Sequence, residues 1–439
     1  MALSPQIVVD EIVELAAGKR VWVAYSGGVD SHVLLHLLAK SEHPQLENLA
    51  AIHIDHGLNH DSPKWTQHCA DISTDLNIDF LSLKVTVKNI ESVGMEAAAR
   101  EARYQALQNA LTEKDFLLTA QHQQDQAETL LLQLFRGAGP KGLSAMASHF
   151  MLGETETIRP LLNDSQTDIL NYAQEHNLQW IDDPSNVETR WNRNYIRHEL
   201  WPDIIKRWPS AAQTISRSAE HCAETSELLD DLAEQDLALL EVDKTSTSLP
   251  IKMLLTLSPA RYRNALRHFF LWKKHLLPSS INLQRIIDEV CLAKQDSNPL
   301  VTWSGVEIRR YKDQLYVMSP LPSHNHNYSV EMDSFQDIRL EDGRIIEWCK
   351  VEEDGLKLPI SAKITLRFRQ GGEQIKPQGG EHHKSLKHLF QQWSIPPWQR
   401  DRIPLIFCDD KLVAVIGYCI DDLYSVSDGQ QGSLPQFKV

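Results

Sequence analysis

Short apolar runs alternate with segments of helical spacing along the first part of the chain. The runs, each typical of a β-strand, occupy residues 21–25, 49–55, 80–87 and 116–120. Between them, apolar positions recur at helical spacing in residues 31–40, 63–76 and 95–111. This alternation predicts a doubly wound α/β fold, a parallel sheet with helices on both faces. The nearly uninterrupted apolar strands fit a sheet that is buried on both sides.

The pattern changes in the second half of the chain. A long amphipathic helix is predicted over residues 216–242, and the section after it is predicted to be mostly helical, closing with the strand-like residues 307–318. Residues 319–329, rich in Pro, Ser and Asn, are the best candidate for a linker. Beyond this linker, residues 363–369 and 411–418 indicate some sheet.

Length supports a division into several domains. A chain of 439 residues exceeds what one hydrophobic core normally organises. We expect an α/β domain at residues 1–216, a mostly helical middle domain at 217–320 and a small α+β domain at 321–439.

Composition narrows the class of protein. The six cysteines are scattered without a CxxC pair, which disfavours a disulfide framework, a structural zinc or an iron–sulfur centre. Acidic residues interrupt the first apolar stretch, and no run approaches the ~20 apolar residues of a membrane span, so we expect a cytoplasmic protein that does not bind membranes.

The charge of the chain is unevenly distributed. Lys and Arg number 44 against 59 Asp and Glu, a net charge of −15 that argues against bulk attraction to nucleic acid. Residues 363–402 nevertheless carry eight basic and three acidic residues, a net charge of +5. This segment is therefore the candidate for contact with a polyanion.

Polar clusters follow three of the predicted strands. SGGVDS (residues 26–31) follows the first strand, DHGLNH (55–60) the second and QHQQDQAET (121–129) the fourth. The carboxyl ends of parallel strands form one edge of the sheet, where ligands bind. We therefore expect the three clusters to meet at a single site.

The first cluster has the parts of a phosphate-binding loop. Gly27 and Gly28 let backbone amides approach a ligand without a Cβ atom between them. Ser26 and Ser31 add hydroxyl donors, and the next helix directs its N-terminal partial positive charge at the loop. The loop is neither GxxxxGK[ST] nor GxGxxG. A simple turn with Asp30 as a helix cap would leave the second serine without a role.

This loop resembles the SGGxDS loop of the N-type ATP pyrophosphatases (PP-loop enzymes), which cleave ATP between its α and β phosphates. The resemblance implies ATP and Mg²⁺ as ligands, with Asp30 near the metal and Ile54, at the second strand's end, beside the adenosine. The residues implied to bind the β and γ phosphates are Ser26, Gly27, Gly28, Val29, Asp30 and Ser31.

Two further segments resemble the tRNA(Ile)-lysidine synthetase family within that superfamily. Residues 94–104, GMEAAAREARY, are similar to its GxEAxAREARY motif, which implies that Arg100 faces the reaction centre as a catalytic residue. From the residues alone, Glu96 and Arg100 would form an exposed ion pair on a helix. Residues 119–146 are similar to TAHHxDDQxET followed by RGxGxxGL.

The second of these segments implies that His122 binds ATP and that Asp125 is catalytic. Gln121 and Gln124 depart from the motif, since they stand where the family often has its first histidine and first aspartate. The residues alone predict a capping box between Asp125 and Glu128, with a helix stop at Gly137.

Basic residues in two segments resemble the tRNA contacts of the same family. Residues 180–202 are similar to its D.SN...RN.IR pattern, and the tail is similar to its RxGGE, KxLKxLF and PPWxR elements. We expect the tail tryptophans to pack in the core. The residues implied to bind tRNA are Arg193, Arg197, Arg367, Arg369, Lys384, Lys387 and Arg400.

The resemblance implies an ATP-dependent ligase that modifies the CAU-anticodon isoleucine tRNA. Such an enzyme joins L-lysine to C2 of the wobble cytidine through an adenylated cytidine, releasing pyrophosphate and AMP, so that AUA is read as isoleucine. The candidates to handle the proton of the lysine amine are Asp30 and Asp125. No protein partner is implied, and a homodimer is compatible with the resemblance.

Three alternatives stay open at this stage. A tRNA thiolase or small-molecule amide synthetase shares the loop, although the absent CxxC weakens thiolation. A noncatalytic tRNA-binding protein would not need three polar clusters at one edge. A zinc site at His53, His56 and His60 is unlikely, because residues 53 and 56 of a strand point to opposite faces.

Overall fold

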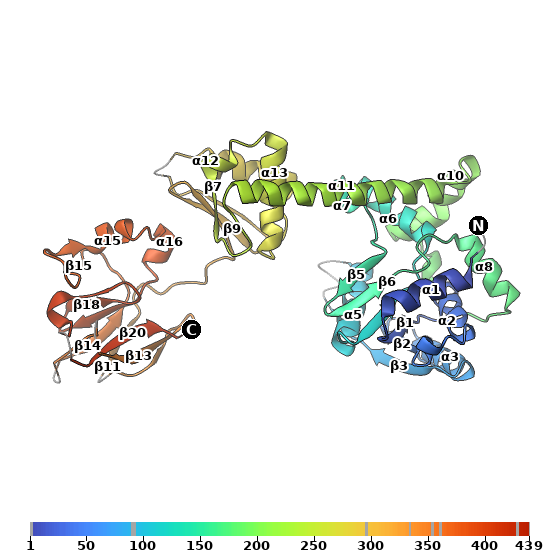
Figure 1. Ribbon diagram of the computed structural model, residues 1–439, viewed down its shortest axis with the longest axis horizontal. Coiled ribbons are helices and arrows are strands. Elements are labelled where there is room, and N and C mark those ends of the chain that lie inside the picture. Colours follow the sequence, from blue (N-terminus) through green and yellow to red (C-terminus); the bar gives the residue numbers. More distant parts are fainter. Residues whose placement is uncertain are drawn as a thin grey trace. The chain divides into compact units, whose positions relative to one another are not determined.

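The computed structural model describes residues 3–88, 94–294, 297–332, 335–352, 355–359, 362–426 and 430–438, without the side chain of Glu96 (Figure 1). The chain forms two compact units, Met1–Asp231 and Leu232–Val439, each with its own hydrophobic cores. All six cysteines are free. Within the described ranges no helix is both long enough and apolar enough to cross a bilayer.

A six-stranded sheet in the order β3-β2-β1-β4-β6-β5 forms the centre of the first unit. All neighbouring strands are parallel except β5 and β6. The predicted parallel sheet is confirmed, although β3 ends at Lys84 rather than at residue 87. The strands are β1 (Arg20–Ala24), β2 (Ala50–Asp55), β3 (Asp79–Lys84), β4 (Asp115–Leu118), β5 (His149–Leu152) and β6 (Thr155–Ile158).

Helices cover both faces of this sheet (Figure 1). The α-helices of the first unit are α1 (Pro5–Ala16), α2 (Val29–Lys40), α3 (Ser62–Asp75), α5 (Met95–Ala110), α6 (Gln123–Phe135), α7 (Pro140–Leu143), α8 (Gln166–Glu175), α9 (Asn192–Tyr195) and α10 (Trp201–Arg207). Two short 3-10 helices are η1 (Pro44–Leu46) and η2 (Pro184–Val187), and a wider π-helical turn is η3 (Ile196–Leu200).

Strand β1 explains why both faces must be covered. Val21 and Val23 pack with α1, α2 and α8 on one face, whereas Trp22 packs with α5 on the other. None of the three side chains is more than 9% exposed. Strand order reverses beside β1, which lies between β2 and β4. The carboxyl ends of β1 and β4 therefore form the switch point, where doubly wound sheets bind their ligands.

The second unit begins within the long helix α11 (Ala211–Leu239), which the spacing predicted at residues 216–242. A helical region follows: α12 (Ile251–Leu254), α13 (Pro259–Trp272), α14 (Ser280–Arg285) and η4 (Ile286–Cys291). It packs on an antiparallel sheet in the order β7-β10-β9-β8. These strands are β7 (Ser248–Pro250), β8 (Leu300–Trp303), β9 (Val306–Tyr311) and β10 (Gln314–Met318). Only β9 and β10 were expected from the sequence, because β7 and β8 are too short to show a period.

The last part of the chain is rich in strands. Its sheets have the orders β11-β14-β17-β18-β19, β12-β13-β20 and β15-β16, and the predicted strands correspond to β14 and β18. The strands are β11 (Ser329–Met332), β12 (Ile338–Arg339), β13 (Ile345–Val351), β14 (Ile364–Arg367), β15 (Gln374–Ile375), β16 (Lys384–Ser385), β17 (Leu405–Cys408), β18 (Lys411–Val415), β19 (Cys419–Ile420) and β20 (Gly432–Phe437). Three short helical segments accompany them, α15 (Leu386–Gln392), α16 (Pro397–Arg400) and η5 (Asp422–Tyr424).

Phe116 on β4 provides a test of the first unit's core. Its side chain is fully buried, so Phe116→Ala should lower the free energy of unfolding of this unit by about 3–5 kcal/mol through lost contacts and a cavity. Urea denaturation followed by circular dichroism measures this loss. The matched control is Phe135→Ala, since Phe135 is 67% exposed and its removal should hardly change the unfolding curve. Equal effects of the two variants would contradict the assigned core.

Candidate active site

The SGGVDS loop lies between β1 and α2 and is closed by its two serines. The Oγ atom of Ser31 accepts the backbone N–H of Ser26 at 3.2 Å and donates to the carbonyl of Gly28 at 3.0 Å. The two serine Oγ atoms lie 3.1 Å apart. The N-cap of α2 is Gly28, so Asp30 is not the helix cap. The second serine thus holds the loop closed at the positive end of α2.

The two glycines of this loop serve different purposes. Gly27 has a φ of +86°, and a Cβ atom there would lie 2.5 Å from Cδ1 of Ile181. Its carbonyl also accepts the N–H of Ile181 at 2.9 Å. Gly28 has an ordinary φ of −74°, and the nearest atom to a Cβ there is the Ser26 Oγ at 3.5 Å. Packing by the protein itself therefore requires the first glycine, whereas the second leaves its surroundings open.

His122 lies between two carboxylates at the switch point. It is the N-cap of α6, where its Nδ1 accepts the backbone N–H of Gln124 at 3.2 Å. A neutral His122 therefore carries its proton on Nε2. This Nε2 atom lies 3.8 Å from Oδ1 of Asp30 and 3.5 Å from Oδ2 of Asp125. The structure thus brings together three residues that the sequence implied.

The capping box at this helix differs from the predicted one. Its members are His122 and Asp125, because the Asp125 side chain accepts the backbone N–H of His122 at 3.2 Å. The predicted pairing of Asp125 with Glu128 was wrong, since α6 starts three residues earlier than that pairing requires. The predicted stop at Gly137 is confirmed by its φ of +71° just beyond the end of α6.

Glu128 is freed from capping and instead holds two arginines in the interior. It is fully buried, and it accepts hydrogen bonds from Arg193 at 3.0 Å and from Arg197 at 2.7 Å. The same arginines donate to Oδ1 of Asp125 at 2.9 and 2.7 Å. The amide of Gln124 donates to Glu128 at 3.1 Å. We call these two carboxylates and two arginines the buried ion-pair cluster.

A widened turn helps to present Arg197. The backbone N–H of Trp201 bonds to the carbonyl of Ile196, five residues back, within η3. Pro202 follows immediately and has no N–H to continue the ordinary helical pattern. Such wide turns recur at functional sites in helices.

The neighbouring carboxylates have opposite proton affinities. Burial, reinforced by the charge of Asp125, raises the pKa of Asp30, and its Oδ1 is buried without a hydrogen-bond partner. Burial would also raise the pKa of Asp125, but His122 and the two arginines outweigh it and hold that pKa below its ordinary value. A bound cation would therefore stabilise the ionised form of Asp30. The charge of Asp125 is already compensated by His122 and the two arginines.

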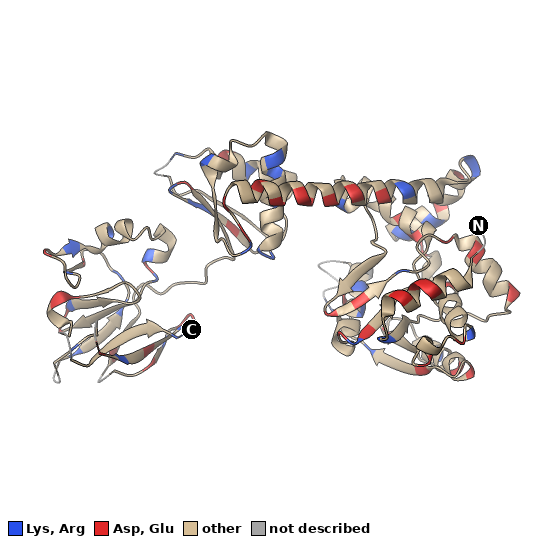
Figure 2. Cartoon of the chain, in the orientation of Figure 1, with Lys and Arg blue, Asp and Glu red and all other residues tan. Residues whose placement is uncertain are grey.

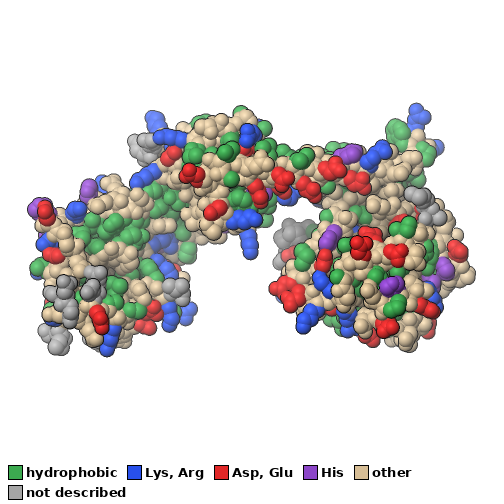
Figure 3. All heavy atoms as spheres, in the orientation of Figure 1, with side chains coloured by type: hydrophobic (Ala, Val, Ile, Leu, Met, Phe, Trp, Pro, Cys, Tyr) green, Lys and Arg blue, Asp and Glu red, His purple; other side chains and the backbone are tan. Residues whose placement is uncertain are grey.

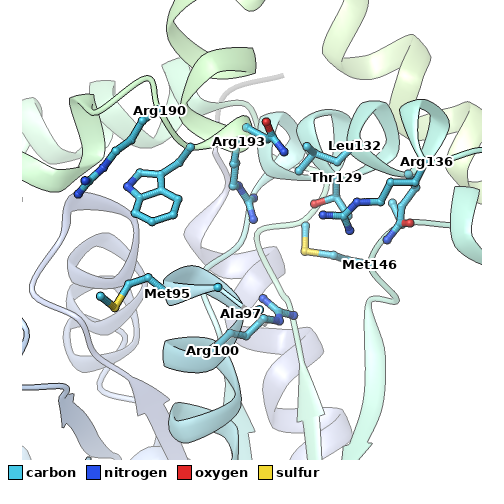
Figure 4. A pocket seen from close by; sticks show the side chains of 14 residues that line it. Met95, Ala97, Arg100, Thr129, Leu132, Arg136, Met146, Arg190 and Arg193 are labelled. Carbon is cyan, nitrogen blue, oxygen red and sulfur yellow. The ribbon is translucent and has the colours of Figure 1, made fainter. Parts of the chain in front are cut away.

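Arg100 lies apart from these carboxylates, in a basic cavity of about 440 Å³. Its guanidinium donates to the hydroxyl of Tyr104 at 3.2 Å and lies over that ring. Arg193 points toward Arg100 from the opposite wall (Figure 4). Since the side chain of Glu96 lies outside the described residues, the pair that it was expected to form with Arg100 is left aside.

Histidines lie at and after the end of β2, the strand end expected to be beside the adenosine. Ile54 is half-buried near the end of β2. The Nδ1 atom of His53 bonds to the carbonyl of Tyr25 at 2.9 Å, and burial lowers the pKa of His56 to about 4. His60 is exposed. In the described part of the chain, no three His, Cys, Asp or Glu residues are grouped to hold a metal.

The implied tRNA contacts of the tail fall into two groups. Arg369 pairs with Asp401 at 3.3 Å, and Arg400 donates to the carbonyl of Ile395 at 2.8 Å. Arg367 lies over the ring of Phe407 at 3.8 Å. By contrast, Lys384 and Lys387 are exposed on β16 and α15.

Aromatic residues of the tail pack against other rings, as expected. Phe390 is fully buried, Trp393 stacks on Tyr418 at 5.1 Å and Trp398 contacts Tyr316 at 5.4 Å.

Acidic residues gather along α11 (Figure 2), where they reach the surface (Figure 3). Seven acidic residues of this helix lie between residues 220 and 236: Glu220, Glu224, Glu227, Asp230, Asp231, Glu234 and Asp236, of which Asp236 is fully buried and paired with Arg261. A row of like charges repels an anionic ligand. Residues 211–239 carry one arginine and seven acidic residues, a net charge of −6, so α11 is an unfavourable surface for a polyanion.

The closed loop at the switch point of a doubly wound sheet, followed by buried carboxylates, defines a PP-loop domain that uses ATP. Residues 3–204 match the family described as the PP-loop domain. Residues 249–316 match the TilS substrate binding domain and residues 364–436 the TilS substrate C-terminal domain.

Full-length relatives then identify the family. The chain is 44% identical to a tRNA(Ile)-lysidine synthase of Coxiella burnetii over 98% of its length and 95% of the relative's. It is 38% identical to one of Legionella pneumophila, with 96% of each chain covered. The chain therefore belongs to the tRNA(Ile)-lysidine synthase family, ATP-dependent ligases that form lysidine in isoleucine tRNA. Among solved structures, a U34-tRNA thiolase of Methanococcus maripaludis is 18% identical with a TM-score of 0.41, covering 50% of this chain and 80% of that one.

Substitution of the two glycines should have opposite consequences. Gly27→Ala should lower the free energy of unfolding by at least about 1 kcal/mol, because alanine is strained at positive φ and its methyl would clash with Ile181. Gly28→Ala should change stability by less than about 0.5 kcal/mol but weaken ATP binding. Thermal melting and an ATP titration separate the two effects. A Gly27→Ala protein that melts like the wild type would refute the packing argument.

Proposed function

We propose that this chain joins L-lysine to C2 of the wobble cytidine of the CAU-anticodon isoleucine tRNA, so that AUA is read as isoleucine. One observation carries the proposal: the closed Ser26–Ser31 loop presents a buried Asp30 oxygen that has no hydrogen-bond partner and faces His122. This arrangement suits an enzyme that must grip a leaving pyrophosphate and a cation at one place.

The first step turns a poor leaving group into a good one. Cytosine O2 attacks the α phosphate of ATP, the bond between the α and β phosphates breaks, and pyrophosphate leaves with its electron pair. Backbone amides in the first turn of α2 would stabilise the negative charge that builds on the β phosphate. Arg100 lies in the basic cavity and would neutralise phosphate charge during this transfer.

Magnesium fits this site through Asp30. Mg²⁺ in phosphoryl-transfer sites is bound by one or two carboxylates together with substrate phosphates and water. Oδ1 of Asp30 is a carboxylate oxygen without a protein donor, whereas both oxygens of Asp125 already accept hydrogen bonds. Bound there, Mg²⁺ would screen the charge of the phosphates.

In the second step the side-chain amine of lysine attacks C2, the bond between C2 and O2 breaks, and AMP leaves. The amine must first lose a proton, since its ordinary pKa is about 10.4. An Asp30 that is not holding Mg²⁺ is the better partner for the ammonium, because its Oδ1 accepts no hydrogen bond from the protein and burial raises its pKa. Asp125 has a lowered pKa, so its role is to orient His122 and not to act as a base.

Recognition of the tRNA involves the later parts of the chain. Lys384 and Lys387 are the strongest candidates, because they are exposed. Arg193 and Arg197 are held in the buried ion-pair cluster, which makes positioning their first role.

We further propose that the chain has three domains, at residues 1–216, 217–320 and 321–439. The proposed enzyme is cytoplasmic and needs no protein partner, and a homodimer is compatible with it.

Asp30→Asn should abolish incorporation of labelled lysine into the tRNA without loss of stability. The pKa of Asp30 is raised in the folded chain, so its ionised form costs stability once the pH exceeds that raised value. The neutral amide removes this cost, and the melting temperature at pH 7–8 should not fall. Full ligation by this variant would exclude Asp30 from the mechanism.

Asp125→Asn is the matched control for charge removal. The pKa of Asp125 is lowered, so its ionised form contributes stability above the ordinary pKa, and that contribution is lost as pH falls through the lowered value. The variant should be less stable by about 3–5 kcal/mol at pH 7 and approach the wild type only in acid.

For the wild-type chain, AMP release in the presence of tRNA and ATP must depend on lysine. Release of AMP without lysine would favour another reaction.

Lys384→Ser with Lys387→Ser should weaken tRNA binding and leave ATP binding unchanged. Each phosphate contact that is lost should reduce the slope of log affinity against log salt by about 0.7–0.9. Filter binding at several salt concentrations measures this slope. Lys411→Ser, an exposed lysine on β18, serves as the comparison. Unchanged affinity and slope in the double variant would remove these lysines from the tRNA site.

A further inference from the structure

The basic cavity beside the buried ion-pair cluster is a separate feature from the SGGVDS loop, although its Arg100 would also neutralise phosphate charge in the first step. Its walls come from the start of α5, from α6, from the loop after α7 and from residues 190–193. None of the SGGVDS loop residues lines it. Its lining residues are Gly94, Met95, Ala97, Arg100, Thr129, Leu132, Gln133, Arg136, Ala145, Met146, Arg190, Trp191, Asn192 and Arg193.

The charge of this cavity selects an anion. Four of the lining side chains are arginines, and none of the described lining residues is acidic. Arg190 and Arg193 have carboxylate partners, at 2.6 Å in Glu188 and 2.9 Å in Asp125. Arg100 and Arg136 form no ion pair within the described part of the chain. Figure 4 shows Arg100 and Arg136 on different walls of this cavity.

The cavity also offers apolar surface to a flat group. The indole of Trp191 lines it together with Met95, Leu132 and Met146. The guanidinium of Arg190 lies over the Trp191 ring, 4.8 Å from its centroid. A volume of about 440 Å³ exceeds that of a phosphate ion and falls within the usual range for organic ligands. Arginines with an aromatic side chain are the combination that binds unpaired nucleotides.

Among the substrates of the proposed function, one fits this combination. Free lysine carries a net positive charge and is repelled by Arg100 and Arg136, whose guanidinium groups form no ion pair within the described residues. The phosphates of ATP are assigned to the SGGVDS loop. We propose that the cavity holds an unstacked anticodon nucleotide of the tRNA, with Trp191 stacking on its base and Arg100 and Arg136 contacting the adjacent phosphates. This inference rests on the proposed function, from which it takes the tRNA.

The cavity is connected to the reaction centre by two residues. Arg193 lines the cavity and also donates to Asp125 at 2.9 Å. Thr129 lines it too, and its hydroxyl donates to the carbonyl of Asp125 at 2.8 Å. The cavity wall is therefore bonded directly to Asp125, which contacts His122. A base stacked on Trp191 would thus be held at a fixed position relative to the reaction centre.

A fluorescent cytosine analogue tests the stacking. The probe is a CAU-anticodon stem-loop RNA with pyrrolocytosine at the wobble position, titrated with the full chain without ATP or lysine. The wild type should quench its fluorescence, because an indole stacks on the base. Trp191→Ala should lose the quenching and bind the RNA at least about fivefold more weakly. Trp191→Phe should restore most of both, and Trp208→Ala, at a 63% exposed tryptophan, should behave as the wild type.

Two further measurements separate the possible failures. ATP affinity should be unchanged in Trp191→Ala; a loss would assign the cavity to ATP and overturn the proposal. Arg136→Gln should weaken RNA binding and lower its salt slope by about 0.7. The proposal would also be overturned if Trp191→Ala kept the wild-type RNA affinity, the wild-type quenching and the wild-type KM for tRNA. Quenching by a wild-type chain that does not ligate lysine would instead refute the proposed function and leave the nucleotide site standing.

Discussion

The buried ion-pair cluster is the interaction on which the rest of the catalytic unit depends. It joins α6 to the segment formed by α9 and η3 through two carboxylates and two arginines. Removing a charge from water costs several kcal/mol, and an ion pair offsets this only when its hydrogen bonds are satisfied. Here Glu128, fully buried, accepts from both arginines and from Gln124. Each arginine bonds to both carboxylates, so removal of any one of the four groups leaves an uncompensated charge among the remaining three.

This cluster explains why two neighbouring aspartates differ. Asp125 receives both arginines and the N–H of His122, so its charge is fully compensated before any ligand binds. Asp30 lies 3.8 Å from the Nε2 atom of the same His122, but its Oδ1 receives none of these donors. An enzyme that handles Mg²⁺ and an ammonium group needs one carboxylate of each kind: one that stays fixed and one that is free to bind a cation. The cluster creates that difference because it supplies hydrogen-bond donors to Asp125 and none to Asp30.

The fold and the main site residues could be predicted from the sequence because their signals are local. Strand and helix periods placed β1 to β4, and the motif order placed Ser26–Ser31, His122 and Asp125 at one edge of the sheet. Glu128 was missed as a site residue because its partner Arg193 is 65 residues away, and no local pattern reveals that distance in space. The spacing of Glu128 from Asp125 did put both on one face of a helix, which was the available signal.

Other features could not be read from the sequence for the same physical reason. Arg193 and Arg197 were expected to contact tRNA because their segment resembles the family's pattern, and that contact stays a prediction. Their ion pairs with α6, which leave both side chains half-buried, have no local signal. The two glycines were expected to act alike, but the need for Gly27 comes from Ile181, which the chain reaches only after five further strands. In the second unit, β7 and β8 escaped detection because a strand of three or four residues carries too little period.

Charge separation completes the account of how an acidic chain can handle tRNA. The net charge of −15 would repel a polyanion if it were spread evenly. Part of this charge lies along α11, and Asp125 and Glu128 beside the reaction centre are paired with arginines in the buried cluster. The basic cavity beside the cluster keeps Arg100 and Arg136 outside ion pairs within the described residues. Pairing the interior charges therefore does two things at once: it stabilises the switch point, and it leaves the positive groups that face solvent free for phosphates.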